Sequence, residues 1–193
     1  MAEIRNKAIA IAKGNYIIQI DGDLILERHF VEDHVKAASN SHFALGGRAK
    51  FTEEATSKLV DSVKVIPSFF SKGLKVRENA IRFLPLGLLF RNIRRSPMGC
   101  NMSFWKDDML RINGYDNDFV GWGYEDIDVL MRLQAIGITQ TRLKFCGICY
   151  HLYHKKASRA NVINNSNRLA EKKDQQEIIT KNGIAQLKVF TGN

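Results

Sequence analysis

The chain has 193 residues, 45% of them hydrophobic and 25% charged, which is the balance of a soluble globular protein with room for one domain. The formal net charge of +9 favours a polyanionic partner, a phosphorylated substrate or an acidic membrane surface, but the sequence contains no nucleic-acid-binding motif. No apolar run reaches the roughly 20 residues of a membrane span, and the sequence shows no signal peptide. The three cysteines lack the spacing of metal ligands, and their odd number favours a reducing, cytoplasmic compartment.

Helices and strands alternate in the predicted first half of the chain. Four apolar residues share one face of a helix over residues 2–13: Ile4, Ala8, Ile11 and Ala12. Gly14 stands where a C-terminal helix cap belongs. The elements that follow are a short buried strand at 16–21, a helix at 27–39, a strand with a glycine bulge or turn at 42–51, and a helix from Thr52 to Val65.

The second half begins with an irregular, basic segment that runs to about Arg95. The next predicted elements are a strand at 98–105 and a helix at 106–112, which is closed by Asn113 and Gly114. A further helix ends at Ile136 and is capped by Gly137. One or two strands follow at 141–154, and then a helical tail from Ser158 that is interrupted at Gly183. This order predicts an α/β layer with acidic residues at strand ends, where open α/β sheets place ligand sites.

The tripeptide "DGD" follows the first predicted strand. Asp21 and Asp23 flank Gly22, so both carboxylates can be aimed at a shared cation while the glycine allows a ligand to come close. Asp-Gly is also the commonest turn dipeptide, so a tight turn without a ligand explains the same residues.

The stretch "GWGYEDID" (121–128) places three acids at the start of a helix. The helix dipole favours acids there and lowers their pKa, and Asp128 can pair with Arg132 one turn later. A carboxylate at this position can instead accept a proton from a substrate hydroxyl. Trp122 stands between two glycines, where an aromatic side chain suits stacking on a sugar or closure over a substrate.

The stretch "HLYH" (151–154) brings two histidines to a predicted strand end. Strand alternation places His151 and His154 on opposite faces, which argues against one shared metal ion. One of them can still be a metal ligand, while the other packs or stays exposed.

Two long segments carry a resemblance to a known fold. The stretch "RNKAIAIAKGNYIIQIDGD" resembles the middle of family 2 glycosyltransferases, in which a helix with an Arg-Asn start precedes a strand that ends in a DxD motif. The stretch "GCNMSFWKDDMLRINGYDNDFVGWGYEDIDVLMRL" resembles the C-terminal half of β-1,4-galactosyltransferases and bacterial chondroitin-type polymerases, with the pattern G-x-N, G-(F/Y)-D and W-G-x-E-D. Tyr124 departs from this pattern, because the galactosyltransferases have glycine there.

The resemblance implies an α/β fold of the GT-A type, a Rossmann-like nucleotide-diphospho-sugar transferase with a mixed sheet flanked by helices. It implies one domain over 1–193, with a catalytic half at 1–157 and a helical tail at 158–193. The implied activity is metal-dependent, inverting transfer of a sugar from a UDP-sugar to an acceptor hydroxyl of a polysaccharide or glycolipid, as in bacterial polysaccharide biosynthesis. The implied cofactor is Mn²⁺ or Mg²⁺.

The resemblance also assigns roles to residues. Asp126 is the implied base and Glu125 a sugar-binding partner. The donor-binding residues are Asp21, Asp23, Arg5 and Asn6. The substrate contacts are Asn101, Trp122, Gly123 and Tyr124. The metal ligands are Asp23 and His154, with His151 in reserve, and Lys155, Lys156 and Arg159 are candidates to assist the departing diphosphate.

GT-A enzymes open with a β-α-β region that holds the nucleotide base, and no such region precedes the helix before "DGD". We therefore expect an N-terminally truncated fold, with weak or no transferase activity in isolation and homo-oligomerisation to complete the sheet. The alternative functions are a non-catalytic module that binds sugar or polyanion and a phosphoesterase that uses Asp21, Asp23 and His154. The basic segment 70–96 is either a solvated loop or a peripheral contact with an anionic membrane face or a lipid-linked acceptor.

Overall fold

The structure, a computed structural model, describes residues 1–61, 66–93 and 99–187. The chain forms two compact units that alternate along the sequence. Unit 1 contains Met1–Ile17, Phe104–Thr139 and Ala157–Asn193, and unit 2 contains Ile18–Ser103 and Gln140–Lys156. The prediction that 1–193 acts as one domain stays a prediction.

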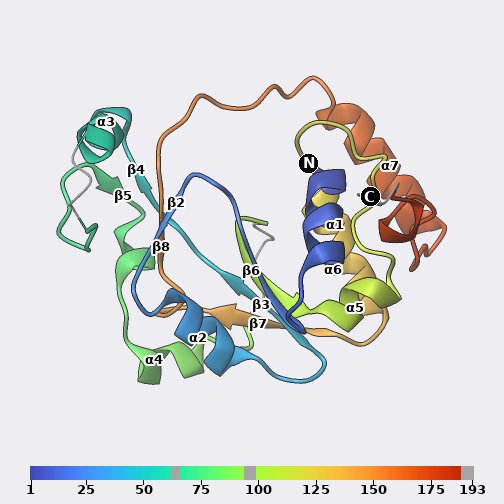
Figure 1. The fold of residues 1–193 in the computed structure, drawn as a ribbon, viewed down its shortest axis with the longest axis horizontal. Helices are drawn as coiled ribbons and strands as arrows, with labels where there is room; N and C mark the ends of the chain where they lie inside the picture. Colours follow the sequence, from blue (N-terminus) through green and yellow to red (C-terminus); the bar gives the residue numbers. More distant parts are fainter. Residues whose placement is uncertain (62–65, 94–98, 188–193) are drawn as a thin grey trace, which may run out of the picture. The chain divides into compact units, whose positions relative to one another are not determined.

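Figure 1 shows the order of helices and strands along the chain. The elements are α1 (Ala2–Ile11), β1 (Tyr16–Ile20), β2 (Leu24–Leu26), α2 (Phe30–Ala37), β3 (His42–Gly46), β4 (Ala49–Phe51), α3 (Glu53–Asp61), β5 (Leu74–Lys75), η1 (Arg77–Ala80), α4 (Leu84–Leu89), β6 (Asn101–Trp105), α5 (Lys106–Arg111), α6 (Glu125–Ala135), β7 (Thr139–Leu143), β8 (Cys149–His151), α7 (Val162–Asp174) and η2 (Ile184–Gln186). The α/β class is confirmed. The predicted end of α3 at Val65 and the predicted start of β6 at Met98 lie outside the described residues.

The strands form two four-stranded sheets. Their orders are β1-β6-β3-β7 and β2-β8-β4-β5. The second sheet is mixed, because β8 pairs antiparallel with β2 and parallel with β4. A core cluster of Ala49, Phe51, Leu74, Ala80, Ile148 and Tyr150 packs against this sheet.

The predicted strand at 42–51 is two strands, β3 and β4, which belong to different sheets. The change of sheet occurs at Gly46 and Gly47. A Cβ on Gly46 would lie 2.3 Å from the Asn101 side chain, so only glycine lets the backbone come this close. Gly46 is therefore required by a close approach between β3 and β6, and Gly47 by a close approach to Asn79 of η1, where an added Cβ would lie 2.8 Å from the side chain.

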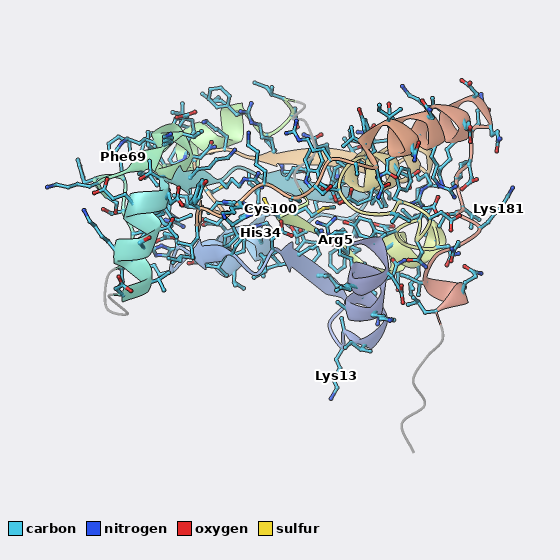
Figure 2. The ribbon with its side chains drawn as sticks, turned by 90° about the horizontal axis from the view of Figure 1, so that it is seen from above. Arg5, Lys13, His34, Phe69, Cys100 and Lys181 are labelled. Atoms are coloured by element: carbon cyan, nitrogen blue, oxygen red, sulfur yellow. The ribbon has the colours of Figure 1, made fainter. Side chains whose placement is uncertain are left out.

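Helix α1 buries a polar face, which is the opposite of the prediction. The apolar residues Ile4 and Ile11 are 72% and 81% exposed, whereas Arg5, Asn6 and Ile9 are buried. Figure 2 shows Arg5 directed into unit 1 and Lys13 projecting away from it. Polar side chains can be buried here because their hydrogen bonds are satisfied by partners in unit 1. Gly14 does not cap the helix, which ends at Ala12 in an extended conformation.

A fully buried ion pair holds α6 in unit 1. Arg132 contacts Asp128 at 2.6 Å and donates hydrogen bonds of 2.7 Å to the carbonyl oxygens of Ile112 and Gly114. The pair predicted at i, i+4 is thus confirmed, and the same arginine caps the loop after α5. Positive φ angles at Asn113, Gly114 and Gly137 confirm the predicted ends of α5 and α6.

The C-terminal segment is helical over α7, as predicted, but it is an integral part of unit 1. Asp116, which is fully buried, accepts hydrogen bonds from Lys172 at 2.7 Å and from Arg168 at 2.9 Å. Lys172 is only 4% exposed and also contacts Glu177 at 2.5 Å. Two basic residues of α7 are therefore anchored by one carboxylate in the loop before α6.

In the part of the chain that the structure describes, no helix is long and apolar enough to cross a membrane.

Replacing Asp116 by asparagine is expected to lower the free energy of unfolding by about 3 kcal/mol, because a buried network loses the charge that compensates Lys172 and Arg168. Urea denaturation of the full chain measures this change. The control is Glu171→Gln on the exposed face of the same helix, which should change stability by no more than about 0.5 kcal/mol.

The same variant gives a test in acid. Burial acts to raise the pKa of Asp116, but hydrogen bonds from Lys172 and from the Asp118 backbone outweigh it, so the pKa lies below its ordinary value of 3.8. The carboxylate therefore stabilises the fold above that pH, and this stabilisation is lost as the pH falls through the folded-state pKa. The stability difference between wild type and variant should shrink from about pH 5 to about pH 2, and an undiminished difference would argue against the network.

Candidate functional site

The pairing of β2 with β8 in unit 2 brings Asp23 beside the two histidines. Leu24 lies opposite His151 in this antiparallel pair, and the Leu152 N–H donates a 3.0 Å hydrogen bond to the Asp23 carbonyl oxygen. Because β8 ends at His151, the chain leaves the strand before it reaches His154. The strand pair thus fixes Asp23 and His151 and allows His154 to turn back toward them.

Asp23, His151 and His154 form a candidate metal site, which we call the metal triad. Each of the three offers one potential ligand atom, and these atoms lie within 4.8 Å of one another. The Nε2 atoms of His151 and His154 lie 3.3 and 3.0 Å from Asp23 Oδ2. The prediction that strand alternation separates the two histidines is wrong, because the alternation stops where β8 ends. Neither histidine is a substitute for the other, since both reach the same carboxylate.

The chemistry of the triad suits a divalent cation. Asp23 Oδ1 is buried and has no hydrogen-bond partner among the described residues, so a cation would satisfy it. His154 Nδ1 lies 2.7 Å from the Lys155 carbonyl oxygen, so Nδ1 donates there and Nε2 is the ring nitrogen directed at Asp23. Burial, and then Arg48, lower the pKa of His151, and a neutral imidazole is the form that binds metal.

Asp21 does not belong to this group of ligand atoms. It follows β1 directly and is half-buried. Its charge contributes to raising the pKa of Cys149, which burial raises to about 12, so it lies near that thiol. Its predicted contact with the donor remains a prediction.

A second cluster, in unit 1, joins α1 to the start of α6. Arg5 Nη1 lies 3.2 Å from Glu125 Oε1 and 2.5 Å from Asp126 Oδ1. The two helices lie side by side in Figure 1. We call these three residues the carboxylate clamp. The Arg5 guanidinium contacts both acids in this structure, and its predicted contact with the donor stays a prediction.

The two acids of the carboxylate clamp differ in exposure. The side chain of Glu125 is 7% exposed and that of Asp126 is 21% exposed. Burial, and then the charge of Asp126, raise the pKa of Glu125, although Arg5 and backbone N–H groups oppose the rise. The expectation that the helix dipole lowers the pKa of an acid here fails for Glu125, because desolvation outweighs the dipole. Asp126 is the acid that a substrate can reach more readily.

The loop before α6 is held in an unusual backbone conformation. Gly121, Gly123 and Tyr124 all have positive φ, at 77°, 107° and 74°. The Gly123 N–H donates to Glu125 Oε2 at 3.1 Å, and Asn165 Nδ2 donates to the carbonyl oxygens of Val120 and Gly123. The backbone of this loop is therefore fixed by the clamp and by α7.

Trp122 remains accessible on this ordered loop. Trp122 is 44% exposed, and the Arg159 guanidinium lies 5.2 Å from the centroid of its ring. An exposed aromatic ring on a fixed backbone can stack on a ligand, as predicted from the sequence. Lys155 and Lys156, predicted to assist a diphosphate, are exposed.

Two residues that were predicted to contact ligands are buried and hydrogen-bonded within the protein, so their ligand contacts stay predictions. Asn6 is fully buried, and its amide is used by the backbone of Tyr115 and the side chain of Asn117. Asn101 is fully buried as well, with its Nδ2 donating to Gly47 O at 2.7 Å and its Oδ1 2.9 Å from His34 Nε2. Both asparagines tie together segments of the protein that are distant in sequence.

Asn165 is the contributor to the site region that sequence reasoning missed. It lies in the polar C-terminal helix, which carries no motif, and its contact with the loop of Trp122 spans more than forty positions in the sequence. His34 was missed too, and its burial next to Ser103 lowers its pKa to about 4. No local pattern marks either residue, because their partners are distant in sequence.

Comparison with known families supports the assignment of the two sequence segments. A family model described as Glycosyl transferase family 2 matches residues 2–93, and one described as N-terminal domain of galactosyltransferase matches residues 90–155. The match to family 2 begins at residue 2. The prediction that a nucleotide-binding region is missing is not confirmed by this match and stays a prediction.

Curated relatives match over a short stretch. Over 41 residues the chain is 49% identical to the validoxylamine A glucosyltransferases of Streptomyces hygroscopicus subsp. jinggangensis (strain 5008) and subsp. limoneus. This match covers 21% of the chain, and it spans only 10% and 9% of the length of those proteins.

Solved structures share the fold at low identity. GalNAc-T7 with UDP, GalNAc and Mn²⁺ matches with a TM-score of 0.57 and 14% identity, over 89% of this chain and 34% of that one. The catalytic domain of Drosophila β1,4-galactosyltransferase 7 in complex with xylobiose matches with a TM-score of 0.54 and 16% identity, over 97% and 64% of the two chains. These likenesses confirm the GT-A-like fold. The chain therefore combines a segment similar to family 2 glycosyltransferases, at residues 2–93, with a segment similar to galactosyltransferases, at residues 90–155.

Proposed function

We propose that this protein is a metal-dependent, inverting glycosyltransferase that moves a sugar from a UDP-sugar to an acceptor hydroxyl of a polysaccharide or glycolipid. The observation that carries the proposal is the convergence of Asp23, His151 and His154 in a chain of glycosyltransferase sequence. The structural neighbour GalNAc-T7, which was solved with UDP, GalNAc and Mn²⁺, supports the choice of donor and cation.

The metal triad fits Mn²⁺ or Mg²⁺, with Mn²⁺ favoured because two of its three donors are imidazoles. Three protein ligands leave coordination positions for oxygen atoms of a diphosphate or water. A bound cation supplies positive charge that stabilises the departing nucleotide diphosphate. Lys155 and Lys156 follow the triad directly and add positive charge to the same segment.

Asp126 is proposed as the base that takes the proton from the acceptor hydroxyl. It is the more exposed acid of the carboxylate clamp, and Arg5 fixes its orientation at 2.5 Å. Glu125 is proposed as a positioning residue rather than a sugar contact, because its carboxylate is turned inward onto Arg5 and the Gly123 N–H. A single base suffices, since an inverting transfer by direct attack forms no covalent enzyme intermediate.

Trp122 is proposed to stack on a sugar ring. Its backbone is fixed by the neighbouring hydrogen bonds while its ring stays exposed, so binding would cost little conformational entropy. Drosophila β1,4-galactosyltransferase 7, whose catalytic domain was solved with xylobiose, supports an acceptor that is itself a sugar.

Loss of either histidine of the metal triad should weaken cation binding. We expect His151→Gln and His154→Gln each to reduce the affinity for Mn²⁺ at least about tenfold, because each removes one direct ligand. Isothermal titration calorimetry with MnCl₂ measures the affinity. The matched control is His42→Gln, a histidine of unit 2 outside the triad, which should bind as the wild type does. Unchanged Mn²⁺ affinity in both triad variants would refute the site.

Loss of the proposed base should slow sugar transfer strongly and leave cation binding unchanged. Asp126→Asn is expected to lower the rate of sugar transfer by a factor of about 10² to 10⁴, the usual contribution of a general base. The assay screens UDP-sugars against glycan acceptors with the full chain. Asp107→Asn, an exposed acid at the start of α5, is the control and should retain activity.

In the same experiment, the Mn²⁺ affinity of Asp126→Asn should equal that of the wild type, because Asp126 is not a triad ligand. Transfer that survives in Asp126→Asn would eliminate this residue as the base, whatever the state of the metal triad.

A further inference from the structure

A cavity of about 380 Å³ opens in unit 2, away from the residues of the metal triad. Its walls come from helix α2, helix α4 and strand β7, which lie close together in Figure 1. It shares no residue with the metal triad or with the carboxylate clamp. Its volume falls within the range of about 300–1,000 Å³ that is typical of small-molecule sites.

The cavity is built from fixed elements. Helix α4 is held by backbone hydrogen bonds on both sides. The Phe83 N–H, just before the helix, donates to the Phe145 carbonyl oxygen at 2.9 Å, and the Arg142 N–H donates to the carbonyl oxygen of Arg91, just after the helix, at 2.8 Å. A Cβ on Gly87 would lie 2.5 Å from the Lys144 carbonyl oxygen, which shows how closely α4 approaches the β7 side. The pocket therefore exists in the folded unit without a partner.

One side of the cavity is apolar and the other is cationic. Ala37, Leu84, Pro85 and Leu143 supply the apolar lining. Lys36, Arg91 and Arg142 supply three cations, of which Lys36 pairs with Glu32 on its own helix.

The acid in the lining is already neutralised. Asp33 accepts hydrogen bonds from Arg82 at 2.6 and 3.1 Å and from the Gly147 N–H at 2.9 Å. Within the described ranges, neither Arg91 nor Arg142 is paired with a carboxylate, and the buried Nε of Arg142 has no hydrogen-bond partner. The cavity thus combines an apolar wall with positive charge that lacks a counter-ion.

We propose that this cavity binds an amphiphilic phosphate, meaning a single aliphatic chain that ends in a phosphate group. The chain lies along the apolar wall, and the two guanidinium groups bind the phosphate, for which their planar donors are suited. The α4 segment also exposes Phe83, Leu89 and Ile93, which extends the apolar surface beside the site. The basic segment predicted at 70–96 therefore contributes α4 to a defined pocket rather than forming only a solvated loop.

Octyl phosphate tests the proposal. Isothermal titration calorimetry with the full chain, in EDTA so that the metal triad cannot contribute, should show one site. We expect octyl phosphate to bind at least about tenfold more tightly than octyl glucoside, which lacks the charge, or inorganic phosphate, which lacks the chain. Equal affinity for octyl phosphate and either control ligand would overturn the proposal.

Two kinds of variant locate the site. Arg91→Gln combined with Arg142→Gln removes the charge and should weaken octyl phosphate binding at least about tenfold. Ala37→Phe fills the apolar side and should abolish binding. Lys75→Gln, in the same basic segment but outside the cavity, is the control and should bind normally.

Circular dichroism establishes that each variant is folded, and the charge variant keeps the test valid if Ala37→Phe does not fold. Octyl phosphate binding that survives in the charge variant would refute the assignment. Binding to phosphatidic acid vesicles without any binding of monomeric octyl phosphate would also refute it, in favour of a membrane surface.

Discussion

The candidate metal site depends on the antiparallel pairing of β2 with β8. This pairing places Asp23, at the turn after β1, next to His151 and fixes the point at which the chain leaves β8. Because the strand stops there, His154 is free of strand alternation and reaches the same carboxylate oxygen. A buried Asp23 oxygen without a partner is costly in a protein interior, and a bound cation would provide the compensation that the described side chains do not.

Unit 1 follows a different constraint, which is the compensation of buried charge. Arg5 joins the two acids of the carboxylate clamp, Arg132 joins Asp128, and Asp116 holds two basic residues of α7. Removing one member of such a network leaves an uncompensated charge, so these pairs fix the geometry more than they add stability. Of these contacts, the Arg5 pairs orient Asp126 and Glu125, and Glu125 accepts a hydrogen bond from the Gly123 N–H in the loop of Trp122.

Local patterns predicted what depends on neighbouring residues. The ends of α5 and α6, the i, i+4 pair of Asp128 with Arg132, and the two strands near the histidines all follow from spacing and turn residues. Long-range contacts could not be predicted this way. The buried face of α1 is polar because Asn6 has hydrogen-bond partners inside unit 1, and these partners lie 109 and 111 positions away in the sequence. The two histidines approach Asp23 because β2 pairs with β8, a pairing that no sequence periodicity encodes.

The central claim is that one divalent cation is held by Asp23 and both histidines. Electron spin-echo envelope modulation of Mn²⁺ added to the full chain tests it directly, because imidazole nitrogens bound to manganese modulate the echo. We predict modulation from two histidine nitrogens in the wild type, reduced to one in either histidine variant. A spectrum of water-coordinated Mn²⁺ without nitrogen modulation would contradict the account.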